Sequence, residues 1–207
     1  MSVSDQAESA VELRDGSRVR LRQGHSSDKQ LLMRGFTRLS PESRYRRFLV
    51  AMPELTDEMV RYLTVIDHHD HEAIVALDDK TGEGVGVARY VRSKERPDVA
   101  EVAVTVIDDW QGRGIGTLLL EAISARARAE GIHTFTALVL ATNEEMIDLF
   151  RRLDPVRIID RAPGTVELEV QIPDAGVAPA LKKLLGIAAQ TRAANGPGAG
   201  SDSRAPR

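Results

Sequence analysis

The amino-acid sequence predicts an α/β fold in which helices flank one mixed sheet. An apolar, strand-like run at 102–107 leads through a glycine-rich turn into a helical pattern at 118–130, and a second apolar run follows at 133–140. Elsewhere, strand-like runs are joined by short glycine turns, which is typical of antiparallel hairpins. The expected order is therefore β-α-α-α-β-β-β-α-β-α-β-β, with hairpins on both sides of a strand–helix–strand unit.

The N-terminal elements are predicted as one strand and three helices. We expect them at 17–22, from Ser26 or Ser27 to about Thr37, at 41–48, and from Thr56 onward. Ser40 followed by Pro41 is a strong helix start, because the serine side chain accepts an unpaired N–H and proline fits the first turn. Thr56 can cap the third helix, whose first turn carries Asp57 and Glu58.

The remaining elements alternate strands and helices. Strands are expected at 73–77, 85–91, 100–107, 133–140, 156–160 and 166–172, and helices at 114–130 and 143–153. Gly131 ends the first of these helices, and Pro155 stops the second. The turns at 78–82 and 162–164 make hairpins of the strands on either side, while 133–140 has the continuous apolar character of a buried parallel strand.

The length of 207 residues suits one domain with tails. We expect residues 1–12, which are polar and aperiodic, to be disordered, and residues 13–173 to form the domain. Residues 174–207 form a C-terminal tail. In it, 178–192 has the spacing of an amphipathic helix, and the Gly-, Ala-, Ser- and Pro-rich remainder is expected to be disordered.

The composition excludes several classes of protein. The chain has no cysteine, so a disulfide framework, a thiolate metal site and a cysteine nucleophile are all ruled out. A net charge of −3 is too mild to indicate nucleic-acid binding. No apolar run approaches the length of a membrane span, and the polar N-terminus lacks a signal-peptide pattern. We therefore expect a cytoplasmic protein with neither nucleic acid nor a membrane as partner.

The glycine-rich turn, QGRGIGT at 111–117, is the most informative stretch of the chain. The first N–H groups of a helix have no partner within it, and the helix dipole favours negative charge there. Glycine lets an anion approach the main chain closely. The turn therefore predicts a phosphate-binding site.

Two common phosphate motifs do not fit this turn. A Walker A loop needs Lys and then Ser or Thr after its last glycine, whereas Thr117 follows Gly116 directly. A dinucleotide fingerprint needs a third glycine where Leu119 stands and a carboxylate at the end of the next strand, and 133–140 has none.

The turn does fit the pattern Gln/Arg-x-x-Gly-x-Gly/Ala, through Gln111, Gly114 and Gly116. This is the pyrophosphate motif of the GNAT N-acetyltransferases, and the chain resembles that family. The resembling segments are 100–106 and 139–146, which are similar to the family's fourth and fifth strands, and 39–48, 86–90 and 100–103, which are closest to bacterial Pat-type protein lysine acetyltransferases. The resemblance implies a GNAT fold, with a mixed, mostly antiparallel central sheet, splayed fourth and fifth strands and flanking helices.

The resemblance also implies acetyl-CoA as the donor, with CoA as the product. Pantetheine would lie in the splay along the edge of Val104 and Val106, with the thioester carbonyl at the N–H near Val104. The implied cofactor-binding residues are Val104, Val106, Gln111, Gly112, Arg113, Gly114, Ile115, Gly116, Thr117 and Asn143. Gln111 is expected to define the backbone of the turn and Arg113 to add charge, while Asn143 is expected to contact the cofactor, to cap the following helix, or both.

Glu101 is the catalytic residue that the resemblance implies. A lysine ammonium, whose ordinary pKa is about 10.4, attacks a thioester only after losing a proton. A nearby carboxylate can take that proton directly or through water. The implied reaction is direct attack in a ternary complex.

Two departures from the family pattern concern the acceptor side of the predicted site. The tyrosine that usually protonates the leaving thiolate is replaced by Phe150, so the thiolate leaves unassisted or Tyr90 or Tyr45 donates. Asp154-Pro155 stands where Gly-Phe is common. Phe150 and Asp154 favour a rival hypothesis, a CoA-binding sensor module with no transfer activity, whereas Glu101 argues against it.

Within the enzymatic interpretation, a protein lysine is the expected acceptor. A small amine such as a polyamine, an amino acid or an aminoglycoside is the alternative, and a homodimer stays open. The run at 67–71, DHHDH, suggests a metal site, but adjacent side chains of an extended segment alternate between faces. We expect a loop there and no metal.

Overall fold

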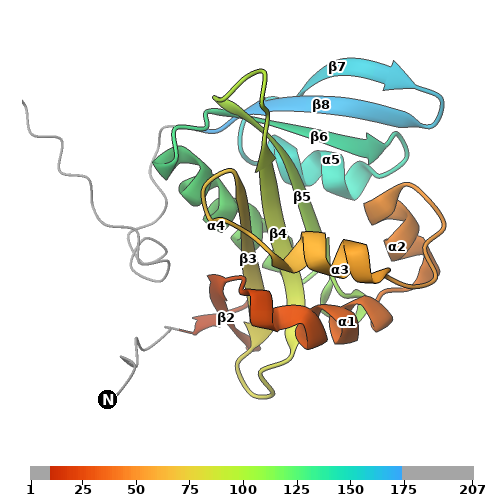
Figure 1. Ribbon diagram of the computed structural model, residues 1–207, viewed down its shortest axis with the longest axis vertical. Helices are drawn as coiled ribbons and strands as arrows, with labels where there is room; N and C mark the ends of the chain where they lie inside the picture. The colour runs from red at the N-terminus through yellow and green to blue at the C-terminus, as the bar shows by residue number, and fades with distance from the viewer. Residues whose placement is uncertain (1–9, 174–207) are drawn as a thin grey trace, which may run out of the picture.

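The structure is a computed structural model that describes residues 10–173, and its centre is one eight-stranded sheet (Figure 1). The strands lie in the order β1-β2-β3-β4-β5-β6-β8-β7. Their bounds are β1 Val11–Glu12, β2 Arg18–Gln23, β3 His71–Asp78, β4 Gly84–Arg92, β5 Val99–Val106, β6 Thr134–Leu140, β7 Arg157–Ala162 and β8 Thr165–Gln171. Every neighbouring pair is antiparallel except β5 with β6, which confirms the predicted mixed, mostly antiparallel sheet.

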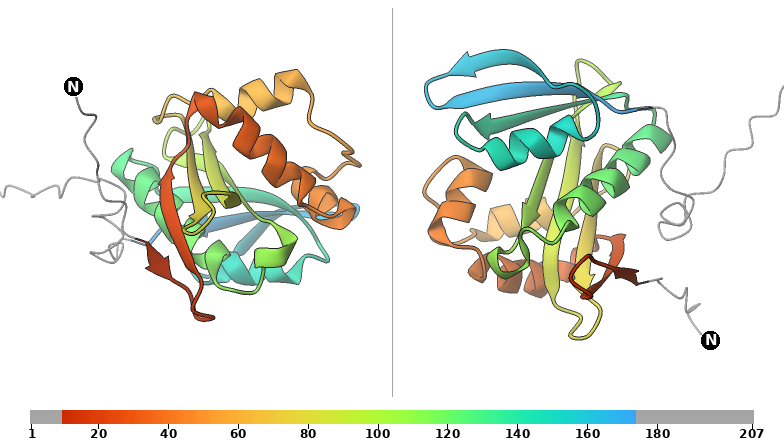
Figure 2. Two further views of the ribbon diagram at one scale, coloured as in Figure 1. Left: turned by 90° about the horizontal axis from the view of Figure 1, so that it is seen from below. Right: turned by 180° about the vertical axis from the view of Figure 1, so that it is seen from behind.

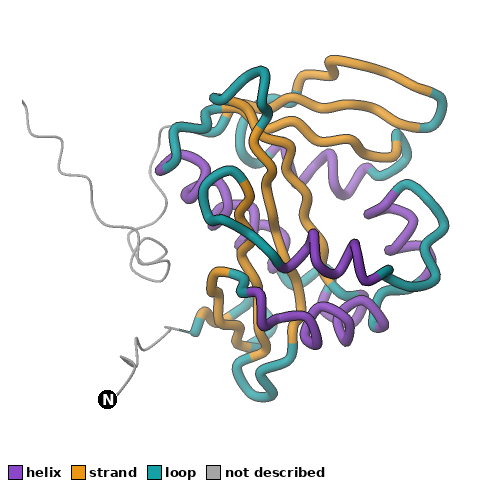
Figure 3. Tube along the Cα trace, in the orientation of Figure 1, coloured by secondary structure: helices purple, strands orange, loops and turns teal. Residues whose placement is uncertain are grey.

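In residues 10–173, five helices cover the two faces of this sheet. They are the purple coils of the tube in Figure 3, and Figure 2 shows them from two further sides. The helices are α1 Lys29–Thr37, α2 Pro41–Phe48, α3 Asp57–Thr64, α4 Ile115–Ala129 and α5 Glu144–Arg151, with 3₁₀ turns at Ser26–Asp28 and Asp108–Trp110. Helices α1 and α3 pack on one face, and α4 and α5 lie on the other (Figure 2).

The helix starts that the sequence predicted are confirmed by their capping bonds. Ser40 Oγ accepts from the N–H of Ser43 at 3.1 Å, and Pro41 occupies the first turn of α2. Thr56 Oγ1 accepts from the N–H of Met59 at 3.2 Å. These signals act over three residues, so they can be read without knowledge of the tertiary structure.

The N-terminal boundary differs from the expectation. Val11 and Glu12 pair with Val19 and Arg18 as β1, although residues 1–12 were expected to lack structure. A strand of two residues has no periodicity to detect, and β2 supplies its pairing partner. Residues 1–9 and the expected tail helix at 178–192 lie outside the described residues.

The strands β5 and β6 separate soon after they meet. They are paired at Val99–Thr134, Ala100–Phe135 and Glu101–Thr136. By contrast, β5 pairs with β4 as far as Val106, and β6 pairs with β8 along its whole length. The sheet therefore holds together at one end and divides at the other, which is the splay that the fold class predicted.

Candidate active site

A cleft with a volume of about 950 Å³ begins where β5 and β6 part and extends over the start of α4. It is lined by Glu101 and by every residue that the sequence assigned to the cofactor: Val104, Val106, Gln111, Gly112, Arg113, Gly114, Ile115, Gly116, Thr117 and Asn143. The structure thus brings together residues that span 43 positions of sequence, from Glu101 to Asn143.

The edge of β5 presents free backbone groups to this cleft. The N–H of Ile107 donates to Val85 O at 3.0 Å, so Val106 and Gly86 form a non-hydrogen-bonded pair of the β4–β5 ladder. By alternation, the N–H and C=O groups of Val104 and Val106 point away from β4. Since β6 has already diverged, these groups face the cleft, and all of them except the C=O of Val106, which accepts from Gln111, have no backbone or side-chain partner within the described residues.

The same alternation separates the side chains. A Cβ added at Gly86 would meet Leu119 of α4 at 2.9 Å, so the face of β4 and β5 that includes Gly86 and Val106 packs on α4. Val104 shares that face and is buried. Glu101 occupies the opposite face, toward α1 and α3, because successive side chains of a strand alternate.

The glycine turn leaves backbone donors exposed at the start of α4. Gly112 and Gly114 have φ values of 74° and 94°, in the left-handed region that favours glycine. The first backbone bond into the helix runs from Leu118 N to Gly114 O. The N–H groups at 115–117 donate no hydrogen bond within the described chain, so they can bind an anion.

Gln111 and Arg113 stabilise the turn itself. Gln111 Nε2 donates to Val106 O at 3.0 Å and to Asp108 Oδ1 at 3.1 Å. The guanidinium of Arg113 donates to Asp109 O at 2.7 Å and to Asp15 Oδ2 at 3.1 Å, and it stacks on Trp110. Gln111 thus ties the turn to the end of β5, in the backbone-defining role that the sequence suggested.

Asn143 caps α5 from inside the cleft. Its Oδ1 accepts from the N–H of Met146 at 3.3 Å, and the residue is 7% exposed. Farther along α5, Phe150 is buried and lines the cleft. A Cβ on Gly116 would contact Leu149 at 3.4 Å, so α5 packs directly against the glycine turn.

Glu101 has a basic neighbour that the sequence did not reveal. Arg47 of α2 lines the same cleft. Burial lowers the pKa of the Arg47 guanidinium, and the Glu101 carboxylate opposes this by favouring the charged form. The run RYRR at 44–47 showed only that α2 is basic, because which of its arginines faces Glu101 depends on how α2 docks on the sheet.

None of the three tyrosines of the chain lines the cleft. The hydroxyl of Tyr90 is buried and donates to His69 O at 3.0 Å, and burial raises its pKa above the ordinary value. Tyr45 is 46% exposed and lies outside the cleft lining. Both tyrosines that the sequence offered as proton donors are therefore misplaced for that role.

The histidine-rich segment at 67–71 is a loop that leads into β3. Asp67 Oδ1 accepts three backbone bonds, from the N–H groups of His69, Asp70 and His71, each at 2.9 Å. His68 contacts Glu72, and His69 contacts Glu130. Over residues 10–173, no group of three or more His, Asp or Glu side chains is arranged to hold a metal ion.

Comparisons with known proteins agree with this geometry. Residues 33–154 match the model of the Acetyltransferase (GNAT) family. Acetyltransferase Pat of Mycolicibacterium smegmatis is 34% identical over 169 residues, which are 82% of this chain and 50% of the relative. This chain therefore spans about half the length of that curated relative.

Solved structures share the fold. The GNAT domain of S. lividans PAT superposes with a TM-score of 0.73 and 34% identity, covering 83% of this chain and 99% of that one. A phosphinothricin acetyltransferase from Sinorhizobium meliloti, solved in complex with AcCoA, gives a TM-score of 0.61 at 20% identity, covering 78% and 96%. Among residues 10–173, no helix has the length and apolar character that crossing a bilayer requires.

Proposed function

The chain belongs to the GNAT acetyltransferase family, and from this premise we propose that it transfers acetyl from acetyl-CoA to the side-chain amine of a protein lysine. The observation that carries the proposal is the position of Glu101. It is the last residue of β5 that pairs with β6, and it stands at the head of a cleft whose other end is the glycine turn.

Acetyl-CoA fits the cleft by the chemistry of its two ends. The N–H groups of Ile115, Gly116 and Thr117 offer donors to the pyrophosphate at the positive end of the α4 dipole. The pantetheine amides complement the N–H and C=O groups of Val104 and the N–H of Val106, as a neighbouring strand would. The C=O of Val106 already accepts from Gln111. Asn143 lies on the opposite wall and keeps its amide N–H₂ group for the cofactor while its oxygen caps α5.

The thioester carbonyl is polarised by the backbone of β5. An N–H group aimed at the developing oxyanion contributes about 3 kcal/mol to the transition state. The N–H of Val104 is our candidate, because it points away from β4 into the cleft.

Glu101 acts as the general base. It takes a proton from the acceptor ammonium, directly or through a water molecule, and the free amine nitrogen then attacks the carbonyl carbon. The C–N bond forms, the C–S bond breaks, and CoA leaves as a thiolate. Since no tyrosine lines the cleft, the thiolate leaves without help from a tyrosine and takes its proton from solvent.

A protein lysine is the acceptor that we propose, because the segments 39–48, 86–90 and 100–103 are most similar to Pat-type protein lysine acetyltransferases. Acetyltransferase Pat and the GNAT domain of S. lividans PAT, each 34% identical to this chain, are in keeping with that resemblance. The exposure of Glu101 suits a side chain that arrives from another protein. A small amine is the second candidate. The cationic group beside Glu101, Arg47, favours it only if the acceptor carries an anionic group.

An acceptor screen tests the proposal. The protein is incubated with acetyl-CoA and with either folded proteins or small amines, thiol release is followed, and products are identified by mass spectrometry. Acetyl-lysine in a protein acceptor is the expected result. If only small amines are acetylated, the acceptor is a small amine and not a protein lysine. If CoA binds but no amine causes thiol release, the result supports the sensor module.

A further inference from the structure

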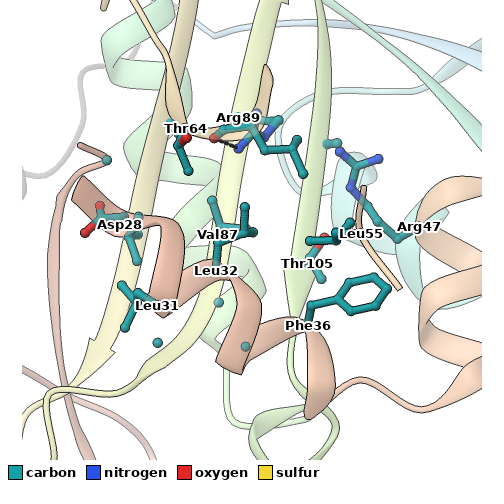
Figure 4. Close-up of a pocket in the computed structure, with 18 of the residues that line it drawn as sticks. Asp28, Leu31, Leu32, Phe36, Arg47, Leu55, Thr64, Val87, Arg89 and Thr105 are labelled. Carbon is teal, nitrogen blue, oxygen red and sulfur yellow. Dashed lines mark hydrogen bonds between the residues drawn. The ribbon is translucent and has the colours of Figure 1, made fainter. Parts of the chain in front are cut away.

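A second hollow lies on the α1 side of the sheet, next to the acetyl-CoA cleft (Figure 4). It has a volume of about 110 Å³ and is lined by α1, α2, α3 and the strands β3 to β5. Its walls are mostly carbon, including Leu31, Leu32, Phe36 and Val87. One water molecule needs roughly 10–15 Å³ on this measure, so the pocket has room for a small organic molecule.

A glycine in the last turn of α1, Gly35, lines this pocket. A Cβ added there would meet no atom within 4 Å. A glycine inside a helix costs about 1 kcal/mol relative to alanine. No close packing requires Gly35, so a larger side chain would have open space at this wall of the pocket.

Arg89 brings a buried positive charge to one end of the pocket. The residue is 7% exposed. Its Nη2 donates to Leu63 O at 2.8 Å, and its Nη1 contacts Nε2 of His71 at 2.9 Å. Burial lowers the pKa of His71 to about 4, so this partner is neutral at physiological pH and does not compensate the charge.

Arg47 adds a second cation near the first. It lines both the pocket and the cleft, and its guanidinium stacks on the Phe48 ring at 4.9 Å. Burial and the charge of Arg47 together lower the pKa of Arg89 to about 10. Among residues 10–173, no carboxylate lies within ion-pairing distance of either arginine.

Of the other charged groups near the pocket, one is already paired with another cation and one acts on Arg47 from the cleft. Asp28, on the other side of the pocket in Figure 4, is engaged by Arg22 through two bonds of 2.7 and 2.8 Å. Glu101 acts on Arg47 only, from the cleft. Two like charges in a partly dry site are costly unless an anion joins them.

We propose that this pocket binds a small monocarboxylate with a short apolar chain. The carboxylate lies between Arg47 and Arg89, and the chain fills the space beside Gly35. A guanidinium matches a carboxylate in geometry as well as charge. The carbon-lined walls accept an apolar chain and give no partner to a second polar group.

The pocket adjoins the acetyl-transfer site. Ala103 and Thr105, together with Arg47 and Phe48, line both the pocket and the cleft. The carboxylate therefore has two sources. It belongs either to a separate acid that binds beside the acceptor, or to an amino acid whose own amine reaches Glu101. Only the second source rests on the proposed function.

Calorimetry on the full chain tests the site. Pentanoate is titrated against the wild-type protein, with pentanamide and pentylamine as probes of the same length. We expect pentanoate to bind at one site and both other probes to bind at least tenfold more weakly, because charged hydrogen bonds contribute about 1.5–3 kcal/mol. Equal affinity for the acid and the amide would overturn the proposal.

Two variants locate the binding. Arg47→Gln should weaken pentanoate binding about tenfold, whereas Arg46→Gln, on the same helix but paired with Glu42 and Glu145, should not. Gly35→Leu should abolish binding by filling the pocket, and Met33→Leu on the exposed side of α1 is its control. Unchanged pentanoate affinity in both Arg47→Gln and Gly35→Leu, with native folds, would refute the site.

A further pair of assays separates the two sources. Wild-type protein is given acetyl-CoA with norleucine, or with a protein acceptor in the presence of pentanoate. If the wild type forms N-acetylnorleucine and Gly35→Leu does not, the carboxylate belongs to the acceptor. If pentanoate changes the rate of protein acetylation, the carboxylate belongs to a separate acid. Pentanoate binding itself requires no turnover, so its failure would leave the proposed transfer reaction intact.

Discussion

Glu101 and Thr136 form the last pair of the parallel ladder between β5 and β6. Beyond this pair, β5 stays paired with β4 as far as Val106 but is no longer paired with β6. The carboxylate proposed as the base therefore stands at the apex of the split, and the free backbone edge of β5 begins beside it. A base and an oxyanion donor on one strand have a separation fixed by the strand itself.

Gly114→Asp should abolish CoA binding while the protein stays folded. Gly114 has a left-handed backbone and open space where a Cβ would lie, so a carboxylate there would occupy and repel the pyrophosphate site. Calorimetry with CoA checks this. Gly164→Asp is the matched control, because its φ of 82° imposes the same kind of strain in the β7–β8 turn, outside the cleft. Equal CoA affinity in both variants would remove the basis for the cofactor site.

Glu101→Gln should lower turnover at neutral pH by on the order of 100-fold or more, with acetyl-CoA affinity unchanged. Glutamine keeps the shape but cannot accept the amine proton. Turnover should recover partly at higher pH, where more amine is already deprotonated. Glu167→Gln, on β8 outside the cleft, serves as the control. A loss smaller than about threefold would make Glu101 a structural residue, since general bases contribute far more.

Asn143→Ala and Asn143→Asp should separate the capping role from the cofactor role. Alanine should lower the free energy of unfolding by about 1 kcal/mol, because the N–H of Met146 loses its acceptor. Aspartate caps as well as asparagine but has no N–H₂ group, so it should preserve stability and weaken CoA binding. Urea denaturation and calorimetry measure the two effects. Native CoA affinity in Asn143→Asp would leave Asn143 as a cap alone.

Stability should fall with acidification between about pH 6.5 and 4, in part through His71. Burial and Arg89 lower the pKa of His71 from 6.5 to about 4 in the folded state. The unfolded chain therefore binds the proton first, so His71 contributes stability that is present above pH 6.5 and lost toward pH 4. His71→Gln should flatten the dependence of the unfolding free energy on pH in this window. An identical slope in the variant would contradict the prediction.

The local elements of the fold were readable from the sequence because their signals act over a few residues. Three helices begin at N-cap residues whose side chains accept from the N–H group three positions later, namely Ser40, Thr56 and Asn143. The glycine turn depends on the left-handed backbone of Gly112 and Gly114, which other residues rarely adopt. The composition and order of these signals sufficed for the mixed sheet and for the glycine turn. The residues of the cofactor site were predicted from the family resemblance, and all of them line one cleft.

What the tertiary structure decided depends on contacts between distant segments. The two residues of β1 exist as a strand only because β2 pairs with them, and the point at which β5 leaves β6 is set by packing around the whole sheet. The burial of Tyr90, which removes it as a proton donor, follows from its place on β4, an interior strand of the sheet. Likewise, Arg47 and Arg89 are 42 positions apart, and neither carries a local signal of a shared pocket. Sequence periodicity shows which face of an element is apolar. The docking of α1, α2 and α3 on the sheet determines which charged side chains line the same pocket, here Arg47 and Arg89.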